Sequence, residues 1–581
     1  MRRVWEWQVA PDIDPVLQRE LQSQLELTPL ALRLLVNRGL TDATQIGRFL
    51  HPALSDLCDP FLMLNMERAT ERVLEALRRR ERIMVYGDYD VDGITAVALL
   101  HLVIGQLGGL VSYYIPNRLE AGYGVNTDAI LEAERSGVTL IISVDCGITA
   151  VEEVGFAVRR GIDFIVTDHH EAAATLPPAL AILNPKQPGD TYPASELSGV
   201  GVAYKLAQAL YERTDQPRSA LEEHLDLVAL GTAADIVPLV GENRVLAHFG
   251  MRQIALTRKP GLQSLSHIAG LMEEQRDISP GQVIFGLAPR LNAAGRLGDS
   301  SRAVQLLITR DEALARQIAR ELDEENKRRK AYDEQTLREA LAKVESEVDL
   351  ESDRIIVLDS DSWHPGVIGI VASRLVETYH LPTILVSVEG DEGKGSARSI
   401  PAFHLTEALR QCHEHLIKYG GHKYAAGLSI RREDIPAFRA RVKEVARSVL
   451  LPDDLVRKLS VDAVIDLHSV DDDFLGHIEQ FAPFGPHNTR PVFVSRGLKC
   501  AGQAQCVGPG NKHLRVRVRQ GQTILDGIGF GFGDVAPVLN RPHVAFDLAY
   551  VPEYNYWQGQ RRIQLRIRDI HTYESGIYFD G

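Results

Sequence analysis

The sequence predicts an α/β protein that consists of a parallel-sheet domain, a long helix, a second α/β lobe and a C-terminal β-barrel. Three observations predict this order. From about residue 70, short apolar runs alternate with helical segments, as in parallel sheets. Residues 311–347 contain no Pro or Gly and many strong helix formers. Beyond residue 460, short alternating strands are separated by Gly and Pro turns.

Length and composition indicate a multidomain globular protein. The chain has 581 residues, of which 45% are hydrophobic and 24% are charged, and its formal net charge is −14. This balance excludes a disordered chain and a collagen-like repeat. No run of about 18 uncharged apolar residues is present to cross a membrane. The five cysteines show neither paired zinc spacing nor a dense disulfide pattern, so we expect a reducing, cytoplasmic location.

The N-terminal half is expected to contain a helical lead-in over 1–60 and the first α/β domain over 61–305. The lead-in segment LTPLALRLLVNRGL carries apolar residues at helical spacing. In the domain, RIMVYG, VTLIISV and IDFIVT are typical of buried strands, and helical segments separate them. Strand–helix–strand order at this spacing implies right-handed crossovers and a parallel sheet that is covered on both faces.

The C-terminal half is expected to contain a connecting helix over 306–348, a second α/β lobe over 349–455 and a β domain over 456–575. In the second lobe, DRIIVLDS and PTILVSV are strands on either side of a helical segment. In the last domain, HLRVRVR and RRIQLRIRDI alternate with period two, so their arginines fall on one face of each strand. A small β-barrel is the expected fold of this domain.

The first chemical signal is VYGDYDVDG, in which Asp88, Asp90 and Asp92 follow a predicted strand at alternate positions. Side chains at the carboxyl ends of parallel strands project into the crevice where open α/β sheets bind ligands. Clustered carboxylates repel one another, and a divalent cation relieves that repulsion. An EF-hand calcium loop is excluded because Leu99 stands where a bidentate Glu is needed and because the preceding segment is a strand. No P-loop motif is present.

The next two predicted strands also end in residues of the kind that bind metals. One strand ends at Asp145 and the next at Asp168-His169-His170. The carboxyl ends of parallel strands meet at one edge of a sheet, so these side chains and those of the first motif should be neighbours. Asp235, at the end of an apolar helix, is either a further ligand or a helix cap.

Mixed carboxylate and imidazole ligands favour Mn²⁺, with Mg²⁺ as the alternative. The number of acids indicates two ions, an arrangement that hydrolyses phosphoesters.

These motifs resemble those of a known family. The series GDYDVDG, VDCG and TDHH is similar to the DHH phosphoesterases, and GTAADIVPL resembles their fourth motif. The segments GKGSARSI and GGHKYAAG look like the associated DHHA1-type lobe. With APRLNAAGRLGD and PNRLEAGYG, the resemblance extends over about 70–570 and is specifically to the RecJ-type nucleases.

The resemblance implies a 5′→3′ exonuclease that is specific for single-stranded DNA, releases mononucleotides and serves DNA repair and recombination. It implies an OB-fold for the C-terminal β domain. It also implies two partners, single-strand-binding protein and a RecQ-type helicase. Two other functions remain: a small-substrate DHH phosphoesterase, of the oligoribonuclease or pyrophosphatase type, and a non-catalytic replisome scaffold related to RecJ.

The resemblance also implies a role for each motif residue. The implied metal ligands are Asp90, Asp92, Asp145, His169 and Asp235. Asp145 is expected to bridge two ions, and Asp88 to act as a ligand or to support one. Asp168 is expected to orient an imidazole, and His170 to meet the scissile phosphate or the leaving oxygen. The expected substrate-binding residues of the two lobes are Arg118, Arg290, Ser396, Arg398 and His422, of which Ser396 and Arg398 are expected on a glycine-rich loop and His422 in a Gly-Gly-His turn.

Charge is unevenly distributed near the C-terminus. Residues 461–479 contain six acids and no Lys or Arg, whereas residues 480–581 contain twelve Lys and Arg against seven Asp and Glu. Cations that track a backbone and aromatics that stack on bases form grooves for single strands. The residues expected to line such a groove are the strand arginines Arg515, Arg517, Arg519, Arg562, Arg566 and Arg568 and, in the connection between the two strands, Tyr554, Tyr556 and Trp557.

One further cluster, Cys412, His413 and His415, could suggest zinc, but on a predicted helix it is interpreted as surface packing.

Overall fold

The computed structural model describes residues 5–116, 124–271, 278–297, 299–557, 560–574 and 577–578. These residues divide into two compact units. One unit contains Gly47–Ala331 and Pro483–Thr489, and the other contains the chain up to Ile46, Tyr332–Ala482 and the chain from Arg490. No helix in the described part of the chain is both long enough and apolar enough to cross a membrane.

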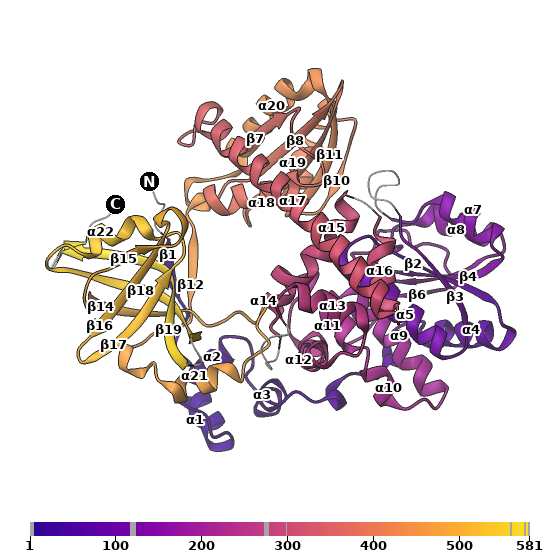
Figure 1. Cartoon of the computed structure of the whole chain (residues 1–581), viewed down its shortest axis with the longest axis horizontal. Coiled ribbons are helices and arrows are strands. Elements are labelled where there is room, and N and C mark those ends of the chain that lie inside the picture. The colour runs from indigo at the N-terminus through magenta and orange to yellow at the C-terminus, as the bar shows by residue number, and fades with distance from the viewer. Residues whose placement is uncertain are drawn as a thin grey trace. The chain divides into compact units, whose positions relative to one another are not determined.

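The first unit contains a five-stranded parallel sheet of order β3-β2-β4-β5-β6 (Figure 1). Its strands are β2 (Arg82–Gly87), β3 (Leu110–Tyr114), β4 (Val138–Val144), β5 (Asp163–Thr167) and β6 (Ala181–Leu183). All but the first residue of β2, and all but the second of β4, are buried. Burial on both faces matches the apolar runs in the sequence, because helices cover both sides of a parallel sheet. The predicted parallel sheet is confirmed.

The helices of this unit connect the strands and extend beyond the sheet. The segments before β2 are α3 (Ala43–Leu50), η1 (Leu54–Asp56), η2 (Pro60–Leu62) and α4 (Met66–Arg79). The sheet helices are α5 (Val91–Gln106), α7 (Thr127–Arg135) and α8 (Val151–Arg159). The helices after the sheet are α9 (Gly199–Arg213), α10 (Arg218–Glu222), α11 (Leu225–Ala234), α12 (Gly241–Leu256), α13 (Pro260–Ile268), α14 (Pro280–Gln282), the π-helical turn η3 (Val283–Leu287), α15 (Ala288–Leu297) and α16 (Ser301–Ile308).

Three apolar helices form the core beside the sheet. Helices α5, α9 and α11 are almost entirely buried and belong to one hydrophobic cluster with the inner faces of β2 and β4. Their apolar residues run around the whole helix, as expected for helices that neighbours surround. Because α5 begins at the end of β2 and α11 ends at Asp235, both helices carry candidate metal ligands at one terminus.

The connecting helix and the second lobe follow. Helix α17 (Glu312–Glu347) is 36 residues long, as the absence of Pro and Gly predicts. The lobe has a mixed sheet of order β10-β11-β9-β8-β7, in which only β7 and β8 are parallel. Its elements are β7 (Ile356–Ser360), α18 (Ile368–Tyr379), β8 (Thr383–Glu389), β9 (Glu392–Arg398), α19 (Leu405–Arg410), η4 (His413–His415), β10 (Lys418–Gly421), β11 (Ala425–Arg431), η5 (Arg432–Asp434), α20 (Ile435–Val449) and η6 (Pro452–Leu455).

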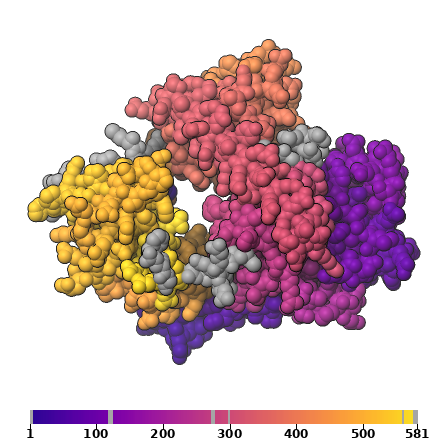
Figure 2. Space-filling model, viewed as in Figure 1, coloured from indigo at the N-terminus to yellow at the C-terminus, as the bar shows by residue number. Residues whose placement is uncertain are grey.

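The C-terminal strands form a closed barrel with the connectivity of an OB-fold. Around the barrel the order is β14-β16-β17-β19-β18-β14, and only β17 and β19 are parallel. These residues, yellow in Figure 2, pack into a compact body. The barrel segments are β13 (Ala463–Val464), η7 (Leu467–Ser469), α21 (Asp472–Glu479), β14 (Phe493–Cys500), β15 (Gln505–Val507), η8 (Pro509–Asn511), β16 (His513–Gln520), β17 (Thr523–Gly529), η9 (Gly533–Val535), α22 (Ala536–Leu539), β18 (Val544–Trp557), β19 (Gln560–Glu574) and β20 (Ile577–Tyr578).

The N-terminal lead-in contains a strand that the sequence analysis did not predict. Helices α1 (Pro15–Gln24) and α2 (Pro29–Val36) are present, but β1 (Glu6–Val9) precedes them and pairs in parallel with β12 (Lys458–Val461). Trp7 of β1 stacks on His571 at 3.8 Å and donates a hydrogen bond to Asp569 of β19. A four-residue strand leaves no periodic pattern by itself, so only its distant partner reveals it.

Candidate metal centre

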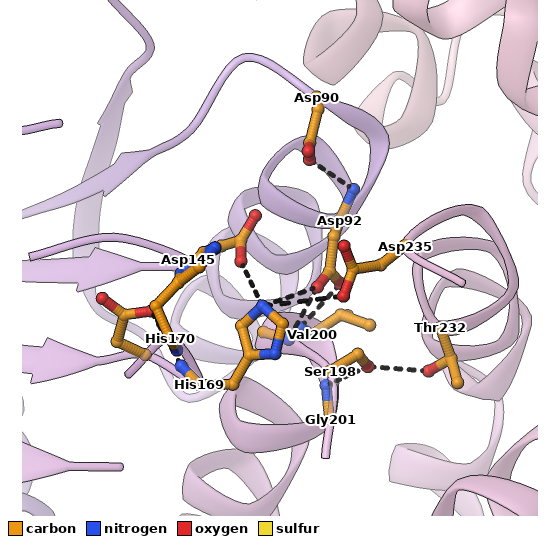
Figure 3. A network of polar contacts seen from close by, with 12 residues as sticks. Asp90, Asp92, Asp145, His169, His170, Ser198, Val200, Gly201, Thr232 and Asp235 are labelled. Carbon is orange, nitrogen blue, oxygen red and sulfur yellow. Dashed lines mark hydrogen bonds and ion pairs between the residues drawn. The ribbon is translucent and has the colours of Figure 1, made fainter. Parts of the chain in front are cut away.

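The ends of three neighbouring strands deliver the predicted acidic and histidine residues to one place. Strand β2 is followed by the aspartates of the first motif, β4 by Asp145 and β5 by Asp168, His169 and His170. Strands β2, β4 and β5 are adjacent in the sheet. Figure 3 shows the His169 imidazole facing the carboxylates of Asp145, Asp92 and Asp235. The convergence expected from parallel strands is therefore present.

The side chains form overlapping groups that could each hold a cation. Among the described residues, ligand atoms lie within 4.8 Å of one another in three groups: Asp88, Asp90 and Asp145; Asp92, His169 and Asp235; and Asp145, His169 and His170. Asp145 joins the first group to His169. The five implied ligands are thus brought together, with Asp145 in the middle.

His169 presents one ring nitrogen to the acids. Its Nε2 lies 3.1 Å from Asp145 Oδ1, 3.6 Å from Asp235 Oδ2 and 3.9 Å from Asp92 Oδ2. Among the described residues Nε2 has no hydrogen-bond partner, while the ring hydrogen-bonds the backbone of Leu197. The bond to Leu197 therefore uses Nδ1, which leaves Nε2 unprotonated and aimed at the carboxylates. This is the tautomer that a metal ligand requires.

The pKa shifts at the site show that the buried carboxylates repel one another and would be stabilised by positive charge. Burial, and then the charge of Asp90, raise the pKa of Asp92 to about 7, and burial and Asp92 raise the pKa of Asp235 to about 9. Burial and the surrounding aspartates raise the pKa of Asp145 well above its ordinary value. Burial lowers the pKa of His169 to about 3, so its imidazole is neutral at pH 7. Buried carboxylates with a neutral imidazole fit divalent cations, whose charge would offset the repulsion.

Asp145 has an unusual backbone conformation. Its φ is +59°, in the left-handed region, and Asp145 is only 2% exposed. Asp and Asn tolerate this region better than other residues that carry a side chain. The turn sends the chain away from the sheet directly after β4 while the carboxylate stays within the cluster.

The N-terminus of α9 holds the Asp92 carboxylate. The backbone N–H groups of Gly199 and Val200 donate to its two oxygens at 2.6 and 2.9 Å. Ser198 caps the same helix: its hydroxyl accepts from Gly201 N–H and hydrogen-bonds Thr232 of α11. Free N–H groups at a helix N-terminus stabilise anions, so α9 fixes this ligand without adding another acid.

The sequence analysis missed Ser198, Gly199 and Val200. The signal for them was a serine followed by glycine-rich sequence at the start of an apolar helix, which is typical of an anion-binding helix N-terminus. A Cβ atom at Gly199 would lie 2.5 Å from Asp145 Oδ1. The glycine therefore makes room for one ligand while its N–H binds another.

We expect Gly199→Ala to lower Mn²⁺ affinity by about 10- to 100-fold, the loss typical when residues that hold metal ligands are changed. The new methyl must displace Asp145 from its present place. Mn²⁺ binding is measured on protein without substrate by electron paramagnetic resonance. Gly105→Ala is the matched control, because the added Cβ in α5 would meet only one atom, at 3.9 Å. Parental Mn²⁺ affinity in Gly199→Ala would contradict the prediction.

The Asp168 carboxylate hydrogen-bonds the ring of His170. Asp168 Oδ1 lies 2.7 Å from His170 Nδ1, and its oxygens also accept from the backbone N–H groups of Ile148, His169 and His170. Burial alone would lower the pKa of His170, but the hydrogen bond and charge of Asp168 and the nearby acids raise it. The raised pKa favours the protonated form of the His170 imidazole at the edge of the cluster.

Of the two substrate-binding arginines predicted in the first unit, only Arg290 lies among the described residues. Arg118 lies outside the described residues. Arg290, in α15, pairs with Asp323 of α17 at 2.9 Å and donates to the Gly286 carbonyl. Its guanidinium is therefore engaged in bonds within the protein.

In the second lobe, Ser396 and Arg398 lie on strand β9 and not on the expected glycine-rich loop. The glycines of this strand make room for neighbours: a Cβ at Gly393 or Gly395 would collide with side chains of β8 and β11. The Arg398 guanidinium lies 3.2 Å from Ser396 Oγ. Both side chains approach Gly369 near the start of α18, while His422 lies exposed in the turn after β10.

In the barrel, the arginines of β16 lie on one exposed face of the strand, as the period-two pattern predicts. Arg515, Arg517 and Arg519 are exposed, and the residues between them are buried. Tyr554 and Tyr556 lie within strand β18, whereas the sequence analysis placed them in a connection. The interpretation of Cys412, His413 and His415 as surface packing on a helix is wrong for Cys412, which is buried in the core of the second lobe just before a 3₁₀ turn. This cluster is not among the candidate metal groups found in the described residues.

Comparisons with known proteins agree with this architecture. The DHH family N-terminal domain matches residues 82–232, the DHHA1 domain matches 352–448 and the RecJ OB domain matches 461–569. The chain is 38% identical over 577 residues to the single-stranded-DNA-specific exonuclease RecJ of Bacillus subtilis, which covers 99% of this chain and 71% of that protein. The chain belongs to the RecJ family of exonucleases.

Solved structures of the RecJ family include metal complexes. The crystal structure of Thermus thermophilus RecJ in complex with Mn²⁺ matches with a TM-score of 0.84 and 32% identity, over 98% of this chain and 80% of that one. The complex of that protein with Mg²⁺ matches with a TM-score of 0.78 and 30% identity, over 97% and 78% of the two chains. This chain, as a member of the RecJ family, thus contains the acidic and histidine residues of a divalent-metal site.

Proposed function

We propose that this protein is a metal-dependent exonuclease that hydrolyses single-stranded DNA from the 5′ end to mononucleotides, in DNA repair and recombination. The observation that carries the proposal is the cluster beside the ends of β2, β4 and β5, where Asp92, Asp145 and Asp235 lie around His169 and Asp90 lies beside Asp145. Family membership supplies the reaction class.

The ligand set supports two divalent ions, Mn²⁺ in preference to Mg²⁺. When bound, such ions lower the pKa of water and offset charge on a phosphodiester. The protein's own contribution is to hold the carboxylates in fixed positions. Asp145 lies between the two groups of ligands, and α9 restrains Asp92 through two backbone N–H groups.

His170 is proposed to act on the leaving oxygen. Asp168 accepts from Nδ1 of His170, so the other ring nitrogen is the one available to substrate. The raised pKa of His170 increases the protonated fraction near neutral pH. A protonated imidazole can donate a hydrogen bond or a proton to the departing oxygen.

The second lobe is proposed to recognise the 5′-terminal phosphate. Ser396 supplies a hydroxyl and Arg398 a guanidinium, and both approach the N-terminal turn of α18 at Gly369. Arginine, hydroxyl and helix N-terminus together are a suitable set for phosphate. His422 is proposed to contribute from the neighbouring turn, and Arg118 and Arg290 remain candidates for phosphate contacts in the first domain.

We expect Arg398→Ala to reduce the preference for 5′-phosphorylated over 5′-hydroxyl DNA by about 10-fold or more, since a hydrogen bond to a charged group contributes about 1.5–3 kcal/mol. Rates on the two substrates are compared at subsaturating concentration. Arg431→Ala serves as the control, because Arg431 lies opposite Glu392 in the β9–β11 ladder, at the other end of these strands from Arg398. An unchanged preference in Arg398→Ala would assign end recognition to other residues.

The barrel is proposed to bind single-stranded DNA through the exposed arginines of β16 and β19 and through Tyr554 and Tyr556. Single-strand-binding protein and a RecQ-type helicase are the proposed protein partners. A small-substrate phosphoesterase would not need this barrel, and a non-catalytic scaffold would not need every ligand of the cluster. These features favour the nuclease over both alternatives.

The deciding experiment compares four substrates in Mn²⁺ buffer: single-stranded DNA, duplex DNA, short RNA and pyrophosphate. We expect rapid release of mononucleotides from a 5′-labelled single strand and delayed release from a 3′-labelled one. Faster turnover of pyrophosphate or short RNA would favour the small-substrate class. Absence of turnover on all four would favour the scaffold.

A further inference from the structure

The OB barrel carries a groove of about 630 Å³ whose lining includes two acids as well as arginines. Arginines from β16 and β19 line it, together with Asp526 of β17 and Asp472. The lining residues are Asp472, Arg515, Arg517, Ile524, Leu525, Asp526, Arg561, Arg562 and Ile563. Asp472 is the lining residue that comes from outside the barrel strands: it is the first residue of α21.

We propose that Asp472 is a built-in competitor for this groove, occupying a phosphate position and limiting the affinity of the barrel for single-stranded nucleic acid. The inference rests on the proposed DNA-binding role of the barrel and adds a regulatory residue to it.

The contacts of Asp472 are those that a phosphate would make. Its Oδ1 accepts from the Arg561 guanidinium at 3.2 Å and from the Tyr554 hydroxyl at 3.0 Å. The Arg561 guanidinium also lies over the Tyr554 ring, 4.3 Å from its centre. Arginine and aromatic rings are the groups that bind the backbone and stack the bases of single strands. One carboxylate therefore engages both kinds of group.

The acidic segment 461–479 now has a partial explanation. Asp462 pairs with Arg38, Asp471 caps α21 at Phe474 N–H, and Glu479 pairs with Arg490. These acids have local structural roles. Asp472 is the acid of this segment that lines the groove.

The ion pair between Asp472 and Arg561 contributes little to folding. The Asp472 side chain is 68% exposed and that of Arg561 is 52% exposed, and exposed ion pairs contribute little to folding. In the groove, however, the carboxylate lies among four arginines, where it offsets the charge that a DNA phosphate would meet. Asp526, 3.8 Å from Arg517, adds to this effect on the neighbouring strand.

The test is Asp472→Asn in the full-length protein, with binding of a fluorescent oligothymidylate measured by anisotropy between 50 and about 300 mM salt, in metal-free buffer to prevent cleavage. Freeing one cation for a phosphate should steepen the slope of log K against log[salt] by about 0.7 and raise affinity by about 3- to 10-fold at the lowest salt. Arg561→Ala added to Asp472→Asn should remove the gain.

Asp473→Asn is the matched control. It makes the same charge change at the next residue of α21, and Asp473 is not among the groove-lining residues. A gain in Asp472→Asn alone supports the proposal. Equal gains in both variants would indicate a general charge effect and overturn it, as would no gain in Asp472→Asn.

The failure of this inference can be separated from failure of the proposed DNA-binding role. Arg515→Ala combined with Arg517→Ala should weaken binding if the groove holds DNA. If that double variant binds normally, the barrel groove is not the DNA site and both proposals fall. If it binds weakly while Asp472→Asn equals the parent, only the competitor role is overturned.

Discussion

Asp145→Asn is expected to reduce nuclease activity by about 10²- to 10³-fold, the loss that follows removal of one preorganised electrostatic contact to a transition state. The physical reason is the position of Asp145 between the two groups of ligands, with Oδ1 3.1 Å from His169 Nε2. Asn retains the size of the side chain and tolerates the φ of +59°. Ala would strain this turn, so Asn separates loss of the ligand from loss of the fold.

The same substitution should leave the metal-free protein as stable as the parent or more stable. Asp145 is buried among acids that raise its pKa, so an uncharged amide removes repulsion, a common trade between stability and activity at functional sites. We expect the melting temperature of the parent to rise with added Mn²⁺ and that of Asp145→Asn to rise much less. This readout does not depend on turnover.

Asp215→Asn provides the matched control. Asp215 is exposed and also has a positive φ, of +52°, so the substitution changes the same atoms in the same backbone conformation away from the cluster. It should retain activity and the Mn²⁺-dependent rise in melting temperature. Turnover close to that of the parent in Asp145→Asn would refute the assignment of the metal centre.

Much of the fold and the centre of the site could be predicted because local sequence determines them. Each strand of the parallel sheet is a short apolar run, and the residue that follows it must lie at the carboxyl edge. That rule alone brings Asp90, Asp145 and His169 together. The alternating arginines of β16 were predictable for the same reason, since side chains on a strand alternate between faces.

What could not be predicted depends on contacts between distant segments. The backbone of Gly199 binds Asp92, which lies 107 residues earlier, and Arg561 binds Asp472, 89 residues earlier. Local periodicity carries no information about such pairs. Glycines were misleading where they serve packing: those in β9 indicated a loop, but they make room for Leu428 and Val386.

The segment Pro483–Thr489 is a further case. It lies within the predicted C-terminal domain and within the matched RecJ OB domain, 461–569, yet its contacts group it with the unit that contains the metal centre. Leu239 N–H donates to the Pro486 carbonyl, and the buried Arg244 guanidinium donates to the Pro483 carbonyl. Removing the chain after about residue 455 would therefore leave buried polar groups of the catalytic unit without these partners, which costs stability. Point substitutions in the barrel are the cleaner test of its role.

Lys205→Met is expected to lower the free energy of unfolding of the unit that contains the metal centre by about 3–5 kcal/mol, the cost of breaking a buried ion pair by removing one partner. Lys205 in α9 is fully buried, and its Nζ lies 2.9 Å from Glu242 Oε1. The same ammonium donates to the Cys58 carbonyl and to Gln208. Methionine is similar in length but leaves the Glu242 carboxylate buried without its cation.

The remaining partners of Glu242 explain why Lys205→Met should lower the free energy of unfolding strongly without unfolding the protein. Tyr192 donates from its hydroxyl at 2.6 Å and Cys58 from its N–H at 2.7 Å, so the carboxylate keeps two neutral donors. Adding Glu242→Gln removes the orphaned charge. The double variant should therefore be less destabilised than the two single losses added together, with a coupling of about 1–3 kcal/mol.

The measurement is urea unfolding in metal-free buffer, followed by circular dichroism, with Arg213→Met as the matched control. Arg213 lies on the same helix and pairs with Glu67, but both side chains are about half exposed, at 48% and 51%, and such pairs contribute about 0–1 kcal/mol. Activity per folded molecule at low temperature should stay near that of the parent in Lys205→Met, because α9 meets the metal centre at its other end, through Gly199. Equal stability of Lys205→Met and Arg213→Met would show that the buried network does not hold α9 against α12.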